Sequence, residues 1–277
     1  MIIDFHTHVY PESVAAKILP AAKKKLGITV PGTGSPEDLR VRMKSSGIYR
    51  SIVLPLAKGQ NDVSSLNDWI QSITVDGLTP FGAIHPLMDG LEEELDRLAT
   101  QGIRGVKIMP LLQEIYPDDP RCDRLYEALI KRDMILVTHA GRDPLDRKEI
   151  FGTPERFSKV IESYPELVLV LAHLGGLRMW DDVSKWLLPA GRNVYFDSSY
   201  ASFYIKENKM TDLIKDIGTD HVLFGSDYPW EDPGRAAGII KRTLELSGSE
   251  REAVLGRNAV KLLGPRTYGL CQSNFFF

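Results

Sequence analysis

Short segments rich in aliphatic and β-branched residues recur along the chain at nearly even intervals, separated by stretches with the pattern of amphipathic helices. This alternation is the sequence form of repeated βα units. The run from Val168 to Ala172 is continuously apolar, which is typical of a parallel strand buried on both faces. Ser35-Pro36 and Thr153-Pro154 are helix-start signals. Eight strands are predicted, at Ile2 to His6, Ser51 to Pro55, Pro80 to Ile84, Gly105 to Met109, Ile135 to His139, Val168 to His173, Asn193 to Asp197 and His221 to Ser226.

Eight parallel strands in 277 residues match the usual size of a closed (β/α)8 barrel, the TIM-barrel type of α/β fold. We predict a single domain, with the barrel over residues 1–264 and a tail over 265–277. An insertion from Tyr10 to Gly34, broken by prolines and glycines, follows the first strand. Two short helices, Glu250 to Leu255 and Asn258 to Leu263, are expected to complete the barrel.

Composition narrows the classes of partner. The 34 basic and 37 acidic residues give a formal charge of −3, so the chain offers no basic field for a nucleic acid. No apolar run approaches the roughly 18 residues of a membrane span, and we expect a cytoplasmic protein without a leader. Cys122 and Cys271 are far apart and form no CxxC motif, which argues against a disulfide framework or a thiolate zinc site. The expected partner is a small molecule, and the site residues below suit a carboxylate.

Histidines are concentrated at the predicted strand ends. Five of the 6 histidines lie there, and the carboxyl ends of barrel strands converge on one mouth. In His6-Thr7-His8 the two imidazoles are two residues apart, which sends both to the same side of the strand. Asp227 ends the eighth strand, which adjoins the first once the sheet closes. The histidines at strand ends are His6, His8, His85, His139 and His173.

Four of these polar residues make a metal-ligand set. His6, His8, His139 and Asp227 together offer three nitrogens and one oxygen to one divalent ion, with room left for water or substrate. Zinc is the expected ion, and manganese, iron and cobalt are the alternatives. An HxH motif alone is weak evidence, and the prediction rests on the joint occurrence of HxH at strand one, histidines at strands five and six, and Asp227 at strand eight.

These motifs resemble a known family. The chain is similar over nearly its whole length to the amidohydrolase superfamily, in the branch containing amino-carboxymuconate-semialdehyde decarboxylase and many "family 2" hydrolases. The resemblance implies metal ligands at His6, His8, His139 and Asp227, with His173 beside the metal as an acid/base or oxyanion-polarising group. The matching segments are Ile3 to His8, Gly102 to Ile108, Thr138 to Gly141, Ala172 to Gly176, Gly225 to Pro229 and Asn258 to Leu263.

Metal chemistry suggests two catalytic residues. A bound Zn²⁺ lowers the pKa of its water to about 7 and polarises a carbonyl. Asp227 can accept the water proton, and His173 is the side chain best suited to proton transfer near pH 7. Our first hypothesis is therefore a hydrolase in which metal-bound hydroxide attacks a small amide, ester or lactone. The alternative is a nonoxidative decarboxylase of an unsaturated or aromatic acid, which needs the metal and a second, cationic anchor.

Two other classes are considered. A metal-dependent deoxyribonuclease of a neighbouring branch shares the HxH opening but supplies a bridging Glu at strand four, where this chain has Lys107. The acidic balance of the chain also disfavours a nuclease. A scaffold or metal-storing protein without activity is the non-enzymatic alternative.

Candidate substrate-binding residues follow the strand ends. Some members of the superfamily carbamylate a strand-four lysine to bridge two metals, but we favour Lys107 as a charged group that pairs with a substrate carboxylate or with Asp227. An arginine fork suits a carboxylate, and a tryptophan can stack on a planar ring. The further candidates by position are His85, Arg142, Arg178, Tyr200 and Trp230.

The resemblance also implies a homodimer. Trp180, Trp186 or the terminal Phe275-Phe276-Phe277 would be exposed and could form its contact. Singly scattered surface aromatics need no special explanation, so this is the weakest of the expectations.

Overall fold

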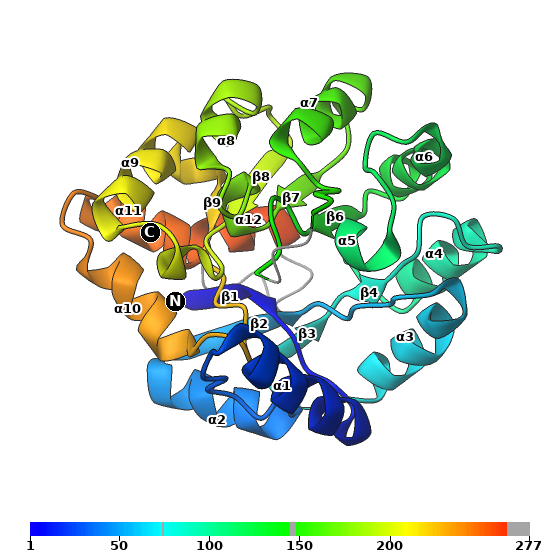
Figure 1. Ribbon diagram of the computed structural model, residues 1–277, viewed down its shortest axis with the longest axis horizontal. Helices are drawn as coiled ribbons and strands as arrows, with labels where there is room; N and C mark the ends of the chain where they lie inside the picture. The colour runs from blue at the N-terminus through cyan, green and yellow to red at the C-terminus, as the bar shows by residue number, and fades with distance from the viewer. Residues whose placement is uncertain (74, 145–147, 265–277) are drawn as a thin grey trace, which may run out of the picture.

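The strands lie together at the centre of the molecule and the helices surround them (Figure 1). The computed structural model describes residues 1–73, 75–144 and 148–264. The strands are β1 (Ile2–Thr7), β2 (Ile48–Val53), β3 (Leu78–Pro80), β4 (Gly82–Ala83), β5 (Gly105–Ile108), β6 (Ile135–Thr138), β7 (Leu169–Leu171), β8 (Val194–Asp197) and β9 (Val222–Leu223).

All neighbouring strands pair in parallel and in chain order, β1 to β3 in one ladder and β4 to β9 in another. The two ladders join at Phe81, whose N–H donates to a β2 carbonyl at 2.9 Å. At the other junction the Phe5 N–H donates to the Phe224 carbonyl at 2.7 Å. The Asp227 N–H donates to the His6 carbonyl at 2.8 Å. The ring therefore closes, and the predicted (β/α)8 barrel is confirmed; the third predicted strand is interrupted at Phe81.

Helices cover the outside of the ring. Ser35 and Thr153 accept backbone N–H bonds at the starts of α2 and α7, as their sequence signals predict. No helix in the described part of the chain combines the length and apolar character that a membrane span requires. The helices are α1 (Glu12–Leu26), α2 (Pro36–Ser46), α3 (Val63–Ser72), α4 (Leu91–Thr100), α5 (Pro110–Gln113), α6 (Asp123–Lys131), α7 (Pro154–Ser163), α8 (Trp180–Trp186), α9 (Glu207–Ile217), α10 (Pro233–Arg242), α11 (Gly248–Glu252) and α12 (Asn258–Leu263), with short helical turns η1 (Gln60–Asp62), η2 (Pro120–Cys122), η3 (His173–Gly175), η4 (Ala201–Phe203), η5 (Thr219–His221) and η6 (Ala253–Arg257).

The insertion after β1 is more regular than the sequence suggests. We expected Pro20 to interrupt it, but α1 continues through this residue. Proline removes one helical hydrogen bond, here to the carbonyl of Ala16. Both Ala16 and Pro20 are exposed, so water can satisfy that carbonyl. Gly27, at a φ of 65°, ends the helix in the left-handed conformation.

The C-terminal helices differ from the prediction by joining into one run. α11 passes through the π-helical turn η6 into α12, where we expected two separate helices. The predicted tail, residues 265–277, and Cys271 lie outside the described residues.

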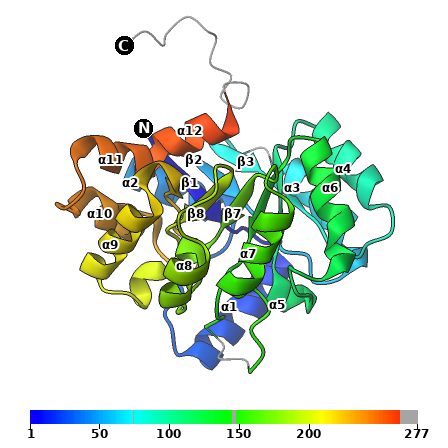
Figure 2. The same cartoon turned by 90° about the horizontal axis from the view of Figure 1, so that it is seen from above.

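Two apolar cores hold the barrel together. One lies between the strands and the outer helices. The other fills the inside of the ring and is covered by α12, so the ring is closed at that end. Figure 2 shows α12 at one end of the barrel and α1 at the other. The inner core consists of Ile3, Phe5, Ile52, Leu54, Phe81, Ile135, Val137, Val170 and Leu223, with Ala259 and Leu263 from α12.

Candidate active site

A cavity of about 800 Å³ is lined by residues at the strand ends and by α1, the helix that Figure 2 shows at the end of the barrel opposite α12. Polar side chains from β1, from β5 and from the residues that follow β6, β7 and β9 meet in its lining. The convergence of distant strand ends expected from the sequence is therefore present. The histidine, lysine and aspartate residues on this lining that the sequence singled out are His6, His8, Lys107, His139, His173 and Asp227.

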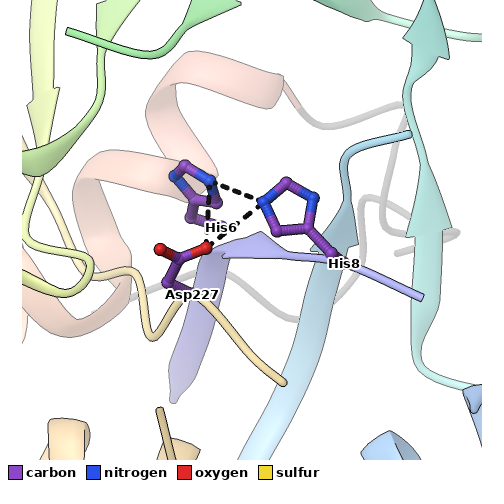
Figure 3. A group of neighbouring side chains, drawn as sticks. All are labelled: His6, His8 and Asp227. Atoms are coloured by element: carbon purple, nitrogen blue, oxygen red, sulfur yellow. Dashed lines mark hydrogen bonds and ion pairs between the residues drawn. The ribbon is translucent and has the colours of Figure 1, made fainter. Parts of the chain in front are cut away.

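Three of these residues point their donor atoms at one another (Figure 3). The Nε2 atoms of His6 and His8 are 3.1 Å apart. Asp227 Oδ1 lies 3.2 Å from His8 Nε2 and 3.6 Å from His6 Nε2. All three side chains are buried. His139 lines the same cavity but lies outside this group of mutually close donor atoms in the described residues.

The hydrogen bonds on the far side of each ring fix which nitrogen carries the proton. His6 Nδ1 lies 2.8 Å from Asp197 Oδ2, and His8 Nδ1 lies 2.6 Å from the Leu54 carbonyl. Both oxygens are acceptors, so in the neutral ring the proton sits on Nδ1 and Nε2 keeps its lone pair. Burial, and then the charge of Lys107, lower the pKa of His6 to about 4, so this ring is neutral at pH 7.

Two lone pairs and a carboxylate oxygen that face a common point repel one another unless a cation lies between them. Burial alone raises the pKa of Asp227, but the neighbouring His6 and His8 hold it below its ordinary value, so the carboxyl is ionised. The donor set of neutral imidazoles and a carboxylate therefore fits a divalent metal ion.

His139 and His173 form a second histidine pair. His173 Nδ1 lies 2.8 Å from the Ser199 carbonyl, which places a proton on Nδ1 and leaves Nε2 as an acceptor. His139 Nδ1, 3.0 Å away, donates to that Nε2. His139 Nε2 is then a bare lone pair; it is buried and has no hydrogen-bond partner among the described residues. Burial, followed by the nearby His173 and Lys107, lowers the pKa of His139 well below 6.5, and a neutral ring with a free nitrogen fits a further metal ligand.

The sequence analysis missed Asp197, the last residue of β8. Besides holding His6 Nδ1, it accepts through Oδ1 from the backbone N–H groups of His173 and Ser199, at 3.1 and 3.0 Å. Burial alone raises the pKa of Asp197, but its interaction with His6, followed by the nearby His173 and Lys107, holds it far below its ordinary value. This carboxylate therefore holds one member of each histidine pair, His6 through its ring and His173 through its backbone. Its position at a predicted strand end is the same signal that identified the other site residues.

The backbone is strained at two site residues. His173 has a φ of 60° and Asp227 a φ of 68°, in the left-handed region that non-glycine residues rarely adopt. Such conformations persist only where surrounding contacts hold them. Here the Asp227 N–H bonds to the His6 carbonyl, and a Cβ on Gly225 would lie 2.9 Å from the His6 Cβ. The loop after β9 is thus packed tightly against the first strand.

Lys107 contributes a buried ammonium group to the cavity. Its Nζ has no hydrogen-bond partner in the described part of the chain, so the expected pairing with Asp227 is not formed. Burial lowers the pKa of Lys107 to about 8, and the negative charges of Asp197 and Asp227 oppose this shift. The group therefore remains mostly charged at pH 7.

The family model described as Amidohydrolase matches residues 3–264 of the chain. The chain belongs to the amidohydrolase family. This confirms the resemblance stated from the motifs and places the protein in a family of enzymes.

Several proteins similar to this chain carry the name of a decarboxylase. Gamma-resorcylate decarboxylase from Polaromonas sp. strain JS666 is 31% identical to this amidohydrolase over 120 residues, which span 38% of this chain and only 36% of that relative. The structure of 5-carboxyvanillate decarboxylase LigW from Sphingomonas paucimobilis has a TM-score of 0.69 at 19% identity, covering 95% of this chain and 98% of its own. A dihydroxybenzoic acid decarboxylase from Polaromonas sp. JS666, solved with manganese and the inhibitor 2-nitroresorcinol, has a TM-score of 0.70 at 17% identity, covering 97% and 99%.

Three of the predicted substrate residues do not reach the cavity of this amidohydrolase. The Arg142 N–H bonds to the Leu177 carbonyl at 2.9 Å and its side chain is exposed. The guanidinium of Arg178, also exposed, lies 5.4 Å from the ring centre of Tyr204. His85 is buried and accepts the Leu87 N–H at 3.2 Å. None of the three is among the residues that line the cavity, and their contact with a substrate stays a prediction.

Tyr200 and Trp230 do line the cavity. Trp180, which we expected to be exposed, is half-buried, and its indole N–H donates to the His173 carbonyl at 3.1 Å. Trp180 thus supports the site, whereas Trp186 is 38% exposed as expected.

Proposed function

We propose that the protein is a metal-dependent, nonoxidative decarboxylase of a small aromatic hydroxy acid. This reverses the order of our hypotheses from sequence, which placed hydrolysis first. The named relatives support the reversal, because each acts on an aromatic acid according to its name. In this reaction the ring carbon that bears the carboxylate takes up a proton, the carbon–carbon bond breaks, and its electron pair returns to the ring as CO₂ leaves.

The observation that carries the proposal is the buried, unpaired ammonium of Lys107 in the same cavity as His6, His8 and Asp227. An unpaired buried charge is costly, and a carboxylate is the ligand that compensates it. An acid substrate thus finds two anchors, the metal site and Lys107. A neutral amide or lactone would leave the ammonium uncompensated.

We propose that one divalent ion binds to His6, His8, His139 and Asp227. When bound, it supplies a Lewis acid that polarises the oxygens of the acid substrate. The donor set accepts zinc, the ion expected from sequence, and also manganese, which the solved relative carries. Both ions therefore belong in the test.

The residues around the substrate have separate roles in binding and in proton transfer. Lys107 holds the carboxylate, and Trp230 offers an aromatic face to the ring. We assign proton delivery to the ring carbon to His173, and we give Asp227, whose carboxyl is ionised, the role of proton acceptor, because both residues expected from sequence line the cavity. In the present arrangement His173 Nε2 accepts a hydrogen bond from His139, so His173 acts as an acid only after that bond opens and Nε2 takes up a proton.

The reaction is tested by assaying protein loaded with zinc or manganese against 2,6-dihydroxybenzoate and 5-carboxyvanillate, with a panel of small amides, esters and lactones alongside. The proposal predicts release of CO₂ and the decarboxylated phenol in equal amounts. Release of amine or alcohol from the panel, without CO₂ from either acid, would restore the hydrolase hypothesis. The inhibitor 2-nitroresorcinol serves as an unreactive analogue for binding measurements.

The role of Lys107 is tested by Lys107→Met. We expect kcat/KM for the acid to fall by roughly 30-fold or more, because losing one partner of a buried charge pair costs about 2–5 kcal/mol. In the metal-free protein without substrate, the same change should raise the free energy of unfolding at pH 7, since a desolvated charge disappears. The control is Lys131→Met at the exposed end of α6. Unchanged kcat/KM, or a loss of stability in the variant, would contradict the assigned role.

A further inference from the structure

The cavity is much larger than a single aromatic ring requires. An internal cavity of about 150 Å³ accommodates benzene. The cavity here has about 800 Å³, and its lining continues beyond the metal-site residues to α1 and α3. A one-ring acid held between Lys107 and Asp227 therefore leaves most of the space for something else.

The outer part of the cavity is apolar and is formed largely by α1. Val14, Ile18, Ala21 and Ala22 lie on one face of this helix, at the spacing of neighbouring turns, and all four line the cavity. Leu66 and Trp69 of α3 also line it. We call this part the α1–α3 chamber; its apolar members are Val14, Ile18, Ala21, Ala22, Leu66 and Trp69.

The chamber face of α1 is not covered by the barrel. Among the described side chains of α1 only Ala15 is buried, while Val14 remains 39% exposed. An uncovered apolar helix face beside a binding site gains free energy when a ligand covers it.

The polar residues near the outer part of the lining do not favour a ligand of either charge. Lys25 and Lys58 are positive, Asp62 is negative and Ser65 is neutral, and all four are exposed. This mixture of signs does not favour a second anionic group on the ligand. The walls themselves, being apolar, favour hydrocarbon.

We propose that the α1–α3 chamber binds an apolar extension of the substrate, such as an alkyl chain or a second aromatic ring attached to the acid on the side away from its carboxylate. The inference rests on the proposed function for the orientation of the acid. The chamber is continuous with the metal site, so one ligand can occupy both. The insertion after β1, rather than the strand ends, would then determine which acid the enzyme prefers.

The experiment uses an unreactive series, 2-nitroresorcinol and its 5-alkyl derivatives with chains of increasing length, titrated calorimetrically into the metal-loaded full chain. The affinity should rise by about fourfold for each methylene that becomes buried, until the chamber is full. An affinity that does not rise with chain length would overturn the proposal.

Two tryptophan variants on the same helix locate the effect. Ala22→Trp fills the chamber, so the ratio of affinities between the longest derivative and 2-nitroresorcinol should fall toward one. Ala16→Trp, on the exposed opposite face of α1 and absent from the cavity lining, should keep the ratio of the natural sequence. The proposal is overturned if Ala22→Trp keeps that ratio, or if both variants lose it equally while circular dichroism shows that they are folded.

The chamber and the decarboxylase activity can be refuted independently of each other. CO₂ release from 2,6-dihydroxybenzoate combined with a flat chain-length dependence refutes the chamber alone. A steep dependence without CO₂ release from any acid refutes the decarboxylase and leaves an apolar chamber beside a different chemistry.

Discussion

At the scale of single residues, the state of His6 depends on Asp197. The Asp197 carboxylate accepts a hydrogen bond from His6 Nδ1–H at 2.8 Å. The proton therefore stays on Nδ1, and Nε2 keeps its lone pair facing His8 and Asp227. Residues that orient metal-binding histidines in this way contribute strongly to metal affinity although they do not touch the ion.

We therefore predict that Asp197→Asn weakens metal binding by about 10- to 100-fold. An amide NH₂ facing Nδ1 would favour the other tautomer, which places a proton on Nε2 where the ion should bind. Competition with a chromophoric chelator measures the affinity, and Asp216→Asn at an exposed site on α9 is the control. If the affinity of Asp197→Asn equals that of the control, Asp197 does not set the tautomer.

The sequence identified the side chains at strand ends but not their partners or the direction of the loops. His6, His8, His139, His173 and Asp227 were predictable because barrel geometry alone brings strand ends together. Asp197 obeys the same rule and was overlooked. His85, Arg142 and Arg178, which follow strand ends but are absent from the cavity lining, lie in loops, whose shapes strand position does not determine.

At the scale of elements, the segment that leads into α10 is held by a buried carboxyl. Glu231 is 1% exposed, accepts from Ser202 at 3.2 Å and pairs with Arg235. Burial raises its pKa to about 7, against 4.5 ordinarily, so the folded chain binds this proton more tightly than the unfolded chain does. The stabilisation from Glu231 is complete below about pH 4.5 and is lost as pH rises through 7.

Glu231→Gln should remove this pH dependence. We predict that the free energy of unfolding of the variant minus that of the natural sequence grows by up to about 3 kcal/mol as the pH is raised from 5 to 8. Urea unfolding of the metal-free protein at several pH values measures the difference. Glu245→Gln at an exposed position is the control. A difference that stays constant with pH would show that Glu231 titrates normally.

Element boundaries were predictable where local signals act alone. The caps at Ser35 and Thr153 determine where α2 and α7 begin. Along β1, however, the pairing with β2 shifts register between Asp4 and Thr7, and within this stretch Phe5 packs inside the barrel while His6 lines the cavity. A regular strand would put these two neighbours on opposite faces. No pattern in the sequence predicts this register shift, because it arises from tertiary packing.

At the scale of the whole molecule, the barrel was predictable because eight similar units in one chain have few ways to bury both faces of their strands. Single-domain organisation, a homodimer and the role of the tail over 265–277 stay predictions. The α1–α3 chamber could not be foreseen, because its shape depends on where α1 lies relative to α3, and the prolines of that segment suggested a broken insertion.

The central claim is that four side chains, from three strand ends that lie far apart in the sequence, hold one divalent ion. Diffraction data collected on both sides of the absorption edge of the loaded metal test it most directly. We predict one anomalous peak within about 2.0–2.2 Å of His6 Nε2, His8 Nε2, His139 Nε2 and an Asp227 carboxylate oxygen. The claim is contradicted by a protein that takes up no ion at this position, or by a second peak bridged to the first through Lys107.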